Sequence, residues 1–330
     1  MDSFGADTVL APVCPLIAIV MCALMLAATP ARAGKADSAL TIFHADSLTA
    51  YMDTLAQQFA DAHPGITVHK EGTGSLDAIR RVTDLHLPCD IVITADWRLL
   101  LKPRNGLDQW VIVFAGNSMG LLYRAHSRGA GSITSQNWFD VLLSDGVRYS
   151  HSNPERDPAG YWTLIVWQLA ERYYHRPGLA AHLAAGCPPS LIRPKSVDLI
   201  SLLQSGELDY YFGYASDARL GELKFLTLPP EINLSEFSRG AEYAQARVEV
   251  GSASTLTAGA PIAYGATLTA NPPNRAAAIE FLEMMLGEPG RKAAEASGLI
   301  AYPSPLGVDA QHKLPQELRP LVRPLEASRR

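Results

Sequence analysis

Cysteine, charge and basic residues are all sparse in this sequence of 330 residues. Four cysteines are too few for a small secreted scaffold that depends on disulfides. Only 18% of the residues are charged and 48% are hydrophobic, a balance that excludes a disordered chain. The net charge of −5 gives no electrostatic basis for binding nucleic acid. We therefore expect a folded protein without a nucleic-acid partner.

The sequence also lacks the spacings that mark a bound metal cation. Its nine histidines include no His-Glu-x-x-His pair. Cys89 and Cys187, the two cysteines beyond the N-terminal region, have no metal-ligand spacing and lie far apart. We expect them to be unpaired thiols, and we expect neither a metal cation nor a cofactor.

The N-terminal region predicts export. Residues 11–28 form an apolar run, and Ala31 and Ala33 follow with the small side chains that signal peptidase accepts. We expect residues 1–33 to be a signal peptide that is cleaved after Ala33, which places the mature protein in the periplasm or another extracytoplasmic space. The alternative is a retained membrane anchor, since about 20 residues suffice to span a bilayer. The region before the apolar run is atypical, because it contains two aspartates and no Lys or Arg.

Strands and helices alternate from the first residues of the mature chain. Apolar runs at 39–45, 66–71 and 90–95 predict strands, and helical periodicity at 47–63 and 75–85 predicts helices between them. This order is typical of βαβ units, so we expect a parallel sheet with helices on both faces.

The rest of the chain predicts a second set of strands and helices. Strands are expected at 110–123, with a break at 116–118, and at 208–214, 225–228 and 261–270. Helices are expected at 138–143, 158–174, 178–185 and 196–204, with one long helix at 274–297.

The breaks between these elements indicate an α/β protein of two lobes, with the second inserted into the first. Lobe I comprises 34–115 and 262–330, and lobe II comprises 116–261. A ligand is expected in the cleft between the lobes, beyond the carboxyl ends of the strands.

Several of the predicted helices begin with a capping residue. Ser47 and Ser75 follow the first two strands, Asp157 precedes Pro158 at the next start, and Ser196 opens a later helix. A helix N-terminus presents unpaired N–H groups and about half a positive charge. Two or more of them in one cleft bind an oxyanion without Arg or Lys. Local capping explains each residue alone, so the hypothesis depends on their convergence.

Stretches along nearly the whole mature chain match one family in order. They are 43–48 (FHADSL), 74–75, 90–97 (DIVITADW), 135–142, 152–154, 157–161, 168–171, 192–197 (IRPKSV), 205–211, 228–234 and 261–265 (PIAYG). On these stretches the chain resembles the tungstate/molybdate-binding proteins of ABC importers, the archaeal-type solute-binding subfamily. The resemblance implies a two-lobed type II periplasmic solute-binding protein that closes on its ligand and docks on the membrane subunits of an ABC permease. We expect a monomer that is not an enzyme.

The resemblance also implies a set of ligand-binding residues: Asp46, Ser47, Ser75, Asp157, Pro158, Ala159, Ser196 and Tyr214. Asp46 stands where the family usually has glycine, and Ser196 stands where it often has an acidic ligand. We therefore predict that N–H and hydroxyl donors hold a tetrahedral tungstate or molybdate ion. The Asp46 side chain is expected to turn away. Asp157 is expected either to cap its helix or to make a single contact to the metal atom of the ion.

Two other functions stay open. Helix N-termini recognise charge and shape more than element, so sulfate, phosphate or an organic anion is the alternative ligand. Residues 116–120 (GNSMG) match the G-x-S-x-G pattern of a serine hydrolase, with Ser118 as the nucleophile. That motif requires a helix after the serine, whereas residues 121–123 predict a strand.

Overall fold

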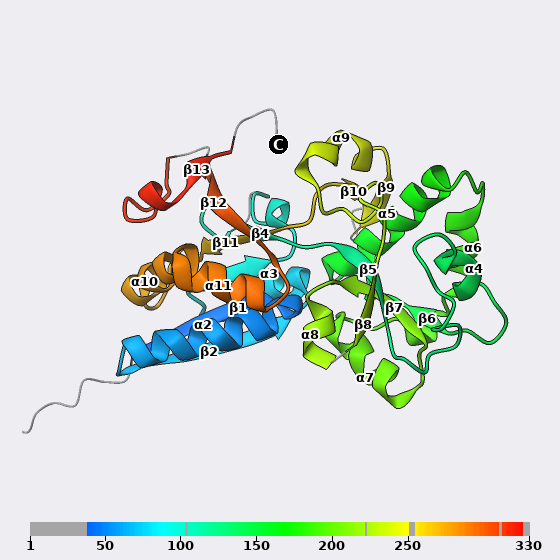
Figure 1. Ribbon diagram of the computed structural model, residues 1–330. Helices are drawn as coiled ribbons and strands as arrows, with labels where there is room; N and C mark the ends of the chain where they lie inside the picture. The colour runs from blue at the N-terminus through cyan, green and yellow to red at the C-terminus, as the bar shows by residue number, and fades with distance from the viewer. Residues whose placement is uncertain (1–37, 103–104, 222, 251–254, 310–311, 326–330) are drawn as a thin grey trace, which may run out of the picture. The chain divides into compact units, whose positions relative to one another are not determined.

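The computed structural model describes residues 38–102, 105–221, 223–250, 255–309 and 312–325. The predicted signal peptide lies outside these residues. The described strands form a seven-stranded sheet, a four-stranded sheet and a two-stranded hairpin (Figure 1). None of the described helices has the length and apolar character needed to cross a membrane.

The seven-stranded sheet has the order β13-β12-β4-β11-β3-β1-β2. Its strands are β1 (Ser38–Ala45), β2 (Ile66–Thr73), β3 (Ile91–Thr94), β4 (Trp110–Gly116), β11 (Ala263–Leu268), β12 (Ile300–Asp309) and β13 (Arg323–Pro324). The predicted parallel arrangement is confirmed for β2, β1 and β3. It is wrong for β11, which is antiparallel to both β3 and β4. The reason is that the chain leaves this sheet along β4 and returns along β11, so these two strands must run in opposite directions.

The four-stranded sheet has the order β6-β7-β5-β8 and is built from the middle of the chain. Its strands are β5 (Met119–Tyr123), β6 (Tyr149–Ser150), β7 (Tyr210–Tyr214) and β8 (Lys224–Thr227), and the hairpin pairs β9 (Arg247–Val250) with β10 (Thr255–Ala258). No described strand between 119 and 258 joins the seven-stranded sheet. This distribution supports the predicted lobes, whose bounds stay a prediction. We keep the names lobe I and lobe II for the residues given above.

Helices connect the strands in both lobes. The α-helices are α2 (Thr49–Ala62), α3 (Ser75–Thr83), α4 (Trp138–Leu142), α5 (Pro158–Tyr173), α6 (Leu179–Gly186), α7 (Val197–Ser205), α8 (Asp217–Gly221), α9 (Gly240–Tyr243), α10 (Arg275–Leu286) and α11 (Glu288–Ala296). Short 3-10 turns lie at η1 (Asp46–Leu48), η2 (Trp97–Leu99), η3 (Pro189–Leu191), η4 (Phe237–Arg239) and η5 (Arg319–Leu321).

The predicted single helix at 274–297 is wrong, because α10 and α11 are separated at Gly287. The backbone of Gly287 is extended, with φ −83° and ψ −169°. Pro289 follows in the first turn of α11, where its missing N–H costs nothing. In the interior of one continuous helix, the proline ring would clash with the carbonyl group four residues earlier.

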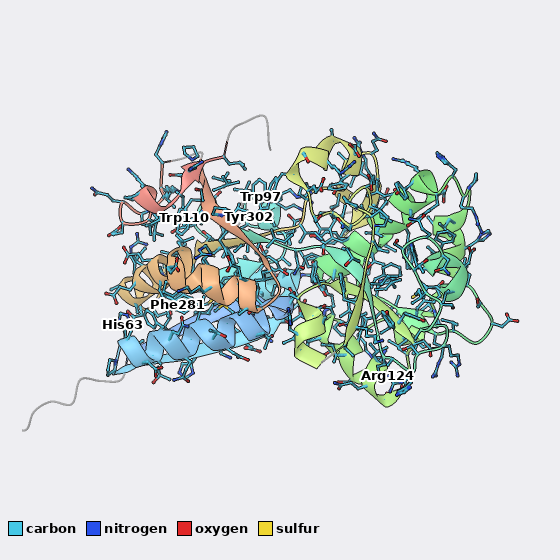
Figure 2. The ribbon with its side chains drawn as sticks, viewed as in Figure 1. His63, Trp97, Trp110, Arg124, Phe281 and Tyr302 are labelled. Atoms are coloured by element: carbon cyan, nitrogen blue, oxygen red, sulfur yellow. The ribbon has the colours of Figure 1, made fainter. Side chains whose placement is uncertain are left out.

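Aromatic packing joins α2 to α10 in lobe I. The ring of Phe59 stacks on His63 at a centroid distance of 4.1 Å and meets Phe281 of α10 edge-on at 5.3 Å. Figure 2 shows His63 and Phe281 close together at this end of the two helices. Full burial of a phenylalanine side chain such as Phe59 or Phe281 stabilises the fold by about 1.5–3 kcal/mol. Cys89 and Cys187 are free, as predicted, and both are buried.

Candidate functional site

The predicted ligand-binding residues all lie where strands end and helices begin. Asp46 and Ser47 form η1 after β1, Ser75 begins α3 after β2, Asp157 precedes Pro158 and Ala159 at the start of α5, Ser196 precedes α7, and Tyr214 ends β7. All of these residues are buried. Because these residues are buried, their hydrogen-bond partners matter for stability: a buried polar atom without a partner lowers the free energy of unfolding by about 1–3 kcal/mol.

The carboxylate of Asp157 links the starts of two helices. Its Oδ1 accepts a hydrogen bond from the Ala159 amide at 3.2 Å, which caps α5. Its Oδ2 accepts one from the Ser196 amide, at the start of α7, at 3.0 Å. Pro158 occupies the first position of α5 and has no amide hydrogen to satisfy. Of the two roles predicted for Asp157, the structure shows the capping role.

The carboxylate of Asp46 points into the site, so the expectation that it turns away is wrong. Its Oδ1 accepts a hydrogen bond from the Ser47 amide at 2.9 Å. Its Oδ2 accepts one from the Val197 amide of α7 at 3.2 Å, which joins lobe I to lobe II. The physical reason is that a buried carboxylate needs N–H donors, and a helix start offers free amides and a favourable dipole. Asp46 therefore occupies amides that were expected to hold the oxyanion.

Hydroxyl groups form a second connection across the site. The Ser47 hydroxyl lies 3.0 Å from that of Tyr264 in β11. The side-chain amide of Asn117 donates to Tyr264 at 2.9 Å and to Ser216 at 2.8 Å, and Ser216 donates to the Ser47 carbonyl at 3.3 Å. Sequence reasoning missed Asn117, Ser216 and Tyr264, although Asn117 lies in the break that separates β4 from β5.

Several buried polar atoms near these helix starts have no hydrogen-bond partner among the described residues. They include Ser196 Oγ, Tyr214 OH and Asp217 Oδ1. Ser75 differs, because its Oγ accepts a hydrogen bond from the Ala95 amide at 3.0 Å within lobe I. A bound polar ligand would form hydrogen bonds with these unpartnered atoms.

Three buried carboxyl groups shape the electrostatics of this region. Burial raises the pKa of Asp217 to about 8. Burial also raises the pKa of Asp157 to about 6, although hydrogen bonds from the Ala159 and Ser196 amides act to lower it. Burial, followed by repulsion from Asp157 and Asp217, raises the pKa of Asp46 well above its usual value. Asp217 was not predicted as a site residue. The capping argument could have found it, because it lies three residues after Tyr214 at the start of α8.

The backbones of the two lobes also meet at Gly74. The Leu76 amide of α3 donates to the Arg156 carbonyl of lobe II at 3.2 Å. A Cβ atom on Gly74 would lie 2.5 Å from the same carbonyl oxygen, closer than such atoms approach. Asp77 pairs with the guanidinium group of Arg156 beside this contact, at 2.6 Å. The absence of a side chain at Gly74 therefore permits this approach.

A second contact between the lobes surrounds Asp96. Its Oδ2 accepts a hydrogen bond from the hydroxyl of Tyr161 in α5 at 2.9 Å and one from Arg98 at 2.8 Å. The Arg98 guanidinium lies 5.1 Å from the ring centroid of Trp162 and donates to the Ala258 carbonyl at 3.2 Å. Tyr161 lies in the first turn of α5, so this contact also fixes the helix that Asp157 caps.

Replacing Tyr161 with phenylalanine is expected to lower the free energy of unfolding by about 1.5–3 kcal/mol, because a hydrogen bond to a buried carboxylate is lost. Urea denaturation measures this value. Tyr173→Phe is the matched control, since Tyr173 is an exposed tyrosine on the same helix. Equal stability of the two variants would contradict a stabilising role for the Tyr161–Asp96 bond.

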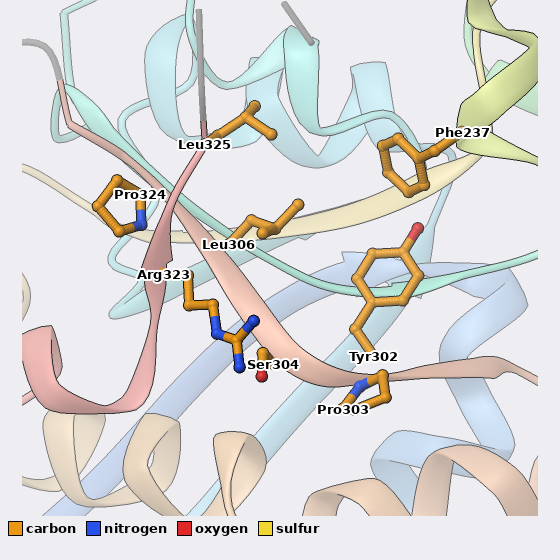
Figure 3. Close-up of a pocket in the computed structure, with 8 residues that line it drawn as sticks. All are labelled: Phe237, Tyr302, Pro303, Ser304, Leu306, Arg323, Pro324 and Leu325. Atoms are coloured by element: carbon orange, nitrogen blue, oxygen red, sulfur yellow. The ribbon is translucent and has the colours of Figure 1, made fainter.

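A separate surface pocket of about 520 Å³ lies beside β12 and β13 (Figure 3). It is lined by Phe237, Tyr302, Pro303, Ser304, Leu306, Arg323, Pro324 and Leu325. The rings of Phe237 and Tyr302 meet edge-on at a centroid distance of 5.5 Å. The lining is mainly apolar and includes none of the predicted ligand-binding residues.

The hydrolase alternative does not fit the geometry at Ser118. This residue lies between β4 and β5, and its carbonyl accepts a hydrogen bond from the Ala215 amide at 3.0 Å. The strand β5 follows it, whereas a nucleophile elbow requires a helix there. In the part of the chain that the structure describes, no three His, Cys, Asp or Glu side chains are grouped as ligands of a metal ion.

Comparisons with known proteins agree on one family. Residues 40–300 match the model of the bacterial extracellular solute-binding protein family. An uncharacterized solute-binding protein of Petrotoga mobilis is 38% identical over 292 residues, which cover 86% of this chain and 90% of the relative. The molybdate/tungstate-binding protein WtpA of Thermococcus kodakarensis is 36% identical over 293 residues, which cover 79% of this chain and 82% of the relative.

Solved structures show the same fold. The periplasmic molybdate-binding protein of Azotobacter vinelandii matches with a TM-score of 0.58 at 20% identity, over 80% of this chain and 99% of that chain. At this identity the match concerns the fold alone. The predicted solute-binding fold and the family resemblance are confirmed.

Proposed function

The chain belongs to the bacterial extracellular solute-binding proteins, and from this premise we propose that it binds tungstate or molybdate between lobes I and II. It then delivers the ion to the membrane subunits of an ABC importer. The names of two relatives, both molybdate/tungstate-binding proteins at 34–36% identity, support this ligand. The family places the protein outside the cytoplasm. Cleavage of residues 1–33, a monomeric state and the absence of enzymatic activity are part of the proposal.

The observation that carries the proposal is the convergence of helix starts. The amides of Ser47, Ala159, Ser196 and Val197 all donate to carboxylate oxygens in one buried region. A set of amides that holds carboxylates has the chemistry to hold another anion. The free hydroxyls of Ser196 and Tyr214 add donors, which suits a tetrahedral ion with four oxygens.

The proposed ligand-binding residues are those of the sequence prediction: Asp46, Ser47, Ser75, Asp157, Pro158, Ala159, Ser196 and Tyr214. Ser47, Ala159 and Ser196 contribute amides, and the serine and tyrosine side chains contribute hydroxyls. In the ion-free protein Asp157 holds the starts of α5 and α7 together through the Ala159 and Ser196 amides, and it must share or release these amides when the ion binds.

Calorimetric titration of the purified protein with tungstate, molybdate, sulfate and phosphate tests the proposal. We expect one ion to bind per chain, with tungstate or molybdate binding more tightly than the other two. Preference for sulfate or phosphate would support the alternative anion, and binding of none of the four would contradict the proposal.

The unpartnered hydroxyl of Ser196 allows a test with two readouts. Ser196→Ala is expected to weaken tungstate binding about tenfold, because a donor to the ion is lost. The same change is expected to raise the free energy of unfolding of the ion-free protein by about 1 kcal/mol, because an unsatisfied buried hydroxyl is removed. Calorimetry and urea denaturation measure the two effects. Ser205→Ala, at the exposed end of the same helix, is the matched control. Weaker binding together with lower stability would indicate a purely structural role.

A further inference from the structure

The carboxylate of Asp46 holds two amides of the proposed oxyanion site. Its two oxygens accept from Ser47 of lobe I and Val197 of lobe II. An oxyanion that binds these amides must displace the carboxylate or share the donors with it. Binding of the ion and the state of Asp46 are therefore linked by geometry.

Buried polar atoms without partners point to a ligand in the same region. The Tyr214 hydroxyl, the Ser196 hydroxyl and Asp217 Oδ1 are all inaccessible to solvent and lack partners within the described residues. The amides that Asp46 holds therefore lie among further groups that the ion-free chain leaves unsatisfied.

The titratable groups that face Asp46 are mainly acids. Asp157 approaches from α5, Asp217 from α8, and the Tyr211 phenol from β7, while Lys195 before α7 is the opposing cation. His44 in β1, two residues before Asp46, is buried and is kept neutral at pH 7, because burial lowers its pKa to about 4. A dianion added beside ionised Asp46 would be repelled by the charge of the carboxylate.

We propose that Asp46 couples oxyanion binding to the uptake of a proton. The incoming dianion replaces the Asp46 carboxylate at the amides of Ser47 and Val197, and the displaced carboxyl group takes up one proton from solvent. No covalent bond changes apart from this protonation, and one negative charge is neutralised as the ion enters. The inference rests on the proposed function of this site and adds a residue that sets how affinity depends on pH.

Because ion binding is coupled to protonation, the inference predicts how the dissociation constant for tungstate changes with pH. Above the pH at which Asp46 ionises in the ion-free protein, each further pH unit raises the dissociation constant by up to about tenfold for one proton taken up. An asparagine side chain at this position cannot ionise, and its NH₂ group acts as a donor in the way a protonated carboxyl does. Asp46→Asn is therefore expected to bind tungstate at least about tenfold more tightly than the wild type at pH 9, with a flatter pH profile.

The experiment is calorimetric titration with sodium tungstate from pH 6 to pH 9, in pairs of buffers with different ionisation enthalpies. The difference in heat between two buffers gives the number of protons taken up per ion. At pH 9 we expect uptake of about one proton by the wild type and by Asp61→Asn, which removes an exposed carboxylate at the far end of α2. We expect uptake near zero for Asp46→Asn.

Three outcomes would overturn the inference. They are tungstate binding by the wild type without proton uptake, loss of binding by Asp46→Asn at every pH, and loss of proton uptake in Asp217→Asn while Asp46→Asn keeps it. If Asp46→Asn does not fold, the proton count of the wild type together with that of Asp217→Asn still decides, because proton uptake that Asp217→Asn loses would be assigned to Asp217 and would overturn the inference. Failure of the wild type to bind any of the oxyanions is distinct, because it contradicts the proposed function itself.

Discussion

Replacing Gly74 with valine is expected to raise the dissociation constant for tungstate at least about 100-fold, equivalent to a loss of about 2.7 kcal/mol. The Cβ atom would lie 2.5 Å from the Arg156 carbonyl oxygen, so lobe I could not approach lobe II at this point. The hydrogen bond from the Leu76 amide to the same oxygen would be lost as well. Since the proposed site takes donors from both lobes, moving the lobes apart removes some of the donors from the ion. Calorimetry measures the affinity.

The matched control is Gly131→Val. Gly131 has open space where its Cβ atom would lie, so this change adds the same side chain without a clash. We expect the control to bind as the wild type does. If Gly74→Val binds tungstate with wild-type affinity, close approach at this point is not required for binding.

Replacing Asp217 with asparagine is expected to stabilise the ion-free protein at pH 8 by several kcal/mol and to have little effect near pH 4. Burial raises the pKa of this carboxyl from 3.8 to about 8 in the folded chain. Between these values the folded state binds more protons than the unfolded state, so the free energy of unfolding falls as pH rises. Each pH unit of this window contributes about 1.4 kcal/mol, so the total is on the order of 5 kcal/mol. The asparagine side chain does not titrate, so the free energy of unfolding of this variant does not fall with pH for this reason.

Urea denaturation at pH 5 and pH 8 measures the effect. The wild type should lose more stability between these pH values than Asp217→Asn does. Asp61→Asn again serves as the control, because that exposed carboxyl makes the same charge change at the surface. A variant that is less stable than the wild type at pH 8 would show that ionised Asp217 is satisfied in the fold.

Local sequence signals predicted the elements that depend on local properties. The break at 116–118 was predicted because Gly, Asn and Ser interrupt an apolar run, and the chain does pass there from β4 in one sheet to β5 in the other. The start of α5 was predicted because Asp157 and Pro158 have strong positional preferences. The break between α10 and α11 was missed, although Pro289 marks it.

Long-range partners could not be predicted in this way. The donor to Asp46 Oδ2 comes from Val197, 151 residues later in the sequence, and no local pattern specifies that pairing. The same holds for Tyr264, whose hydroxyl lies against Ser47 across 217 residues. The orientation of Asp46 was predicted wrongly because its burial, and its need for amide donors, arise only when the lobes meet.

The central claim is that amides at converging helix starts hold the oxyanion, and a crystal structure of the protein with tungstate tests it most directly. The anomalous signal of tungsten locates the ion without ambiguity. We predict the tungsten peak between lobes I and II, with oxygens within hydrogen-bond distance of the amides of Ser47, Ala159, Ser196 and Val197. A peak on a separate surface, or a tungsten atom coordinated directly by the carboxylates of both Asp46 and Asp157, would contradict the account.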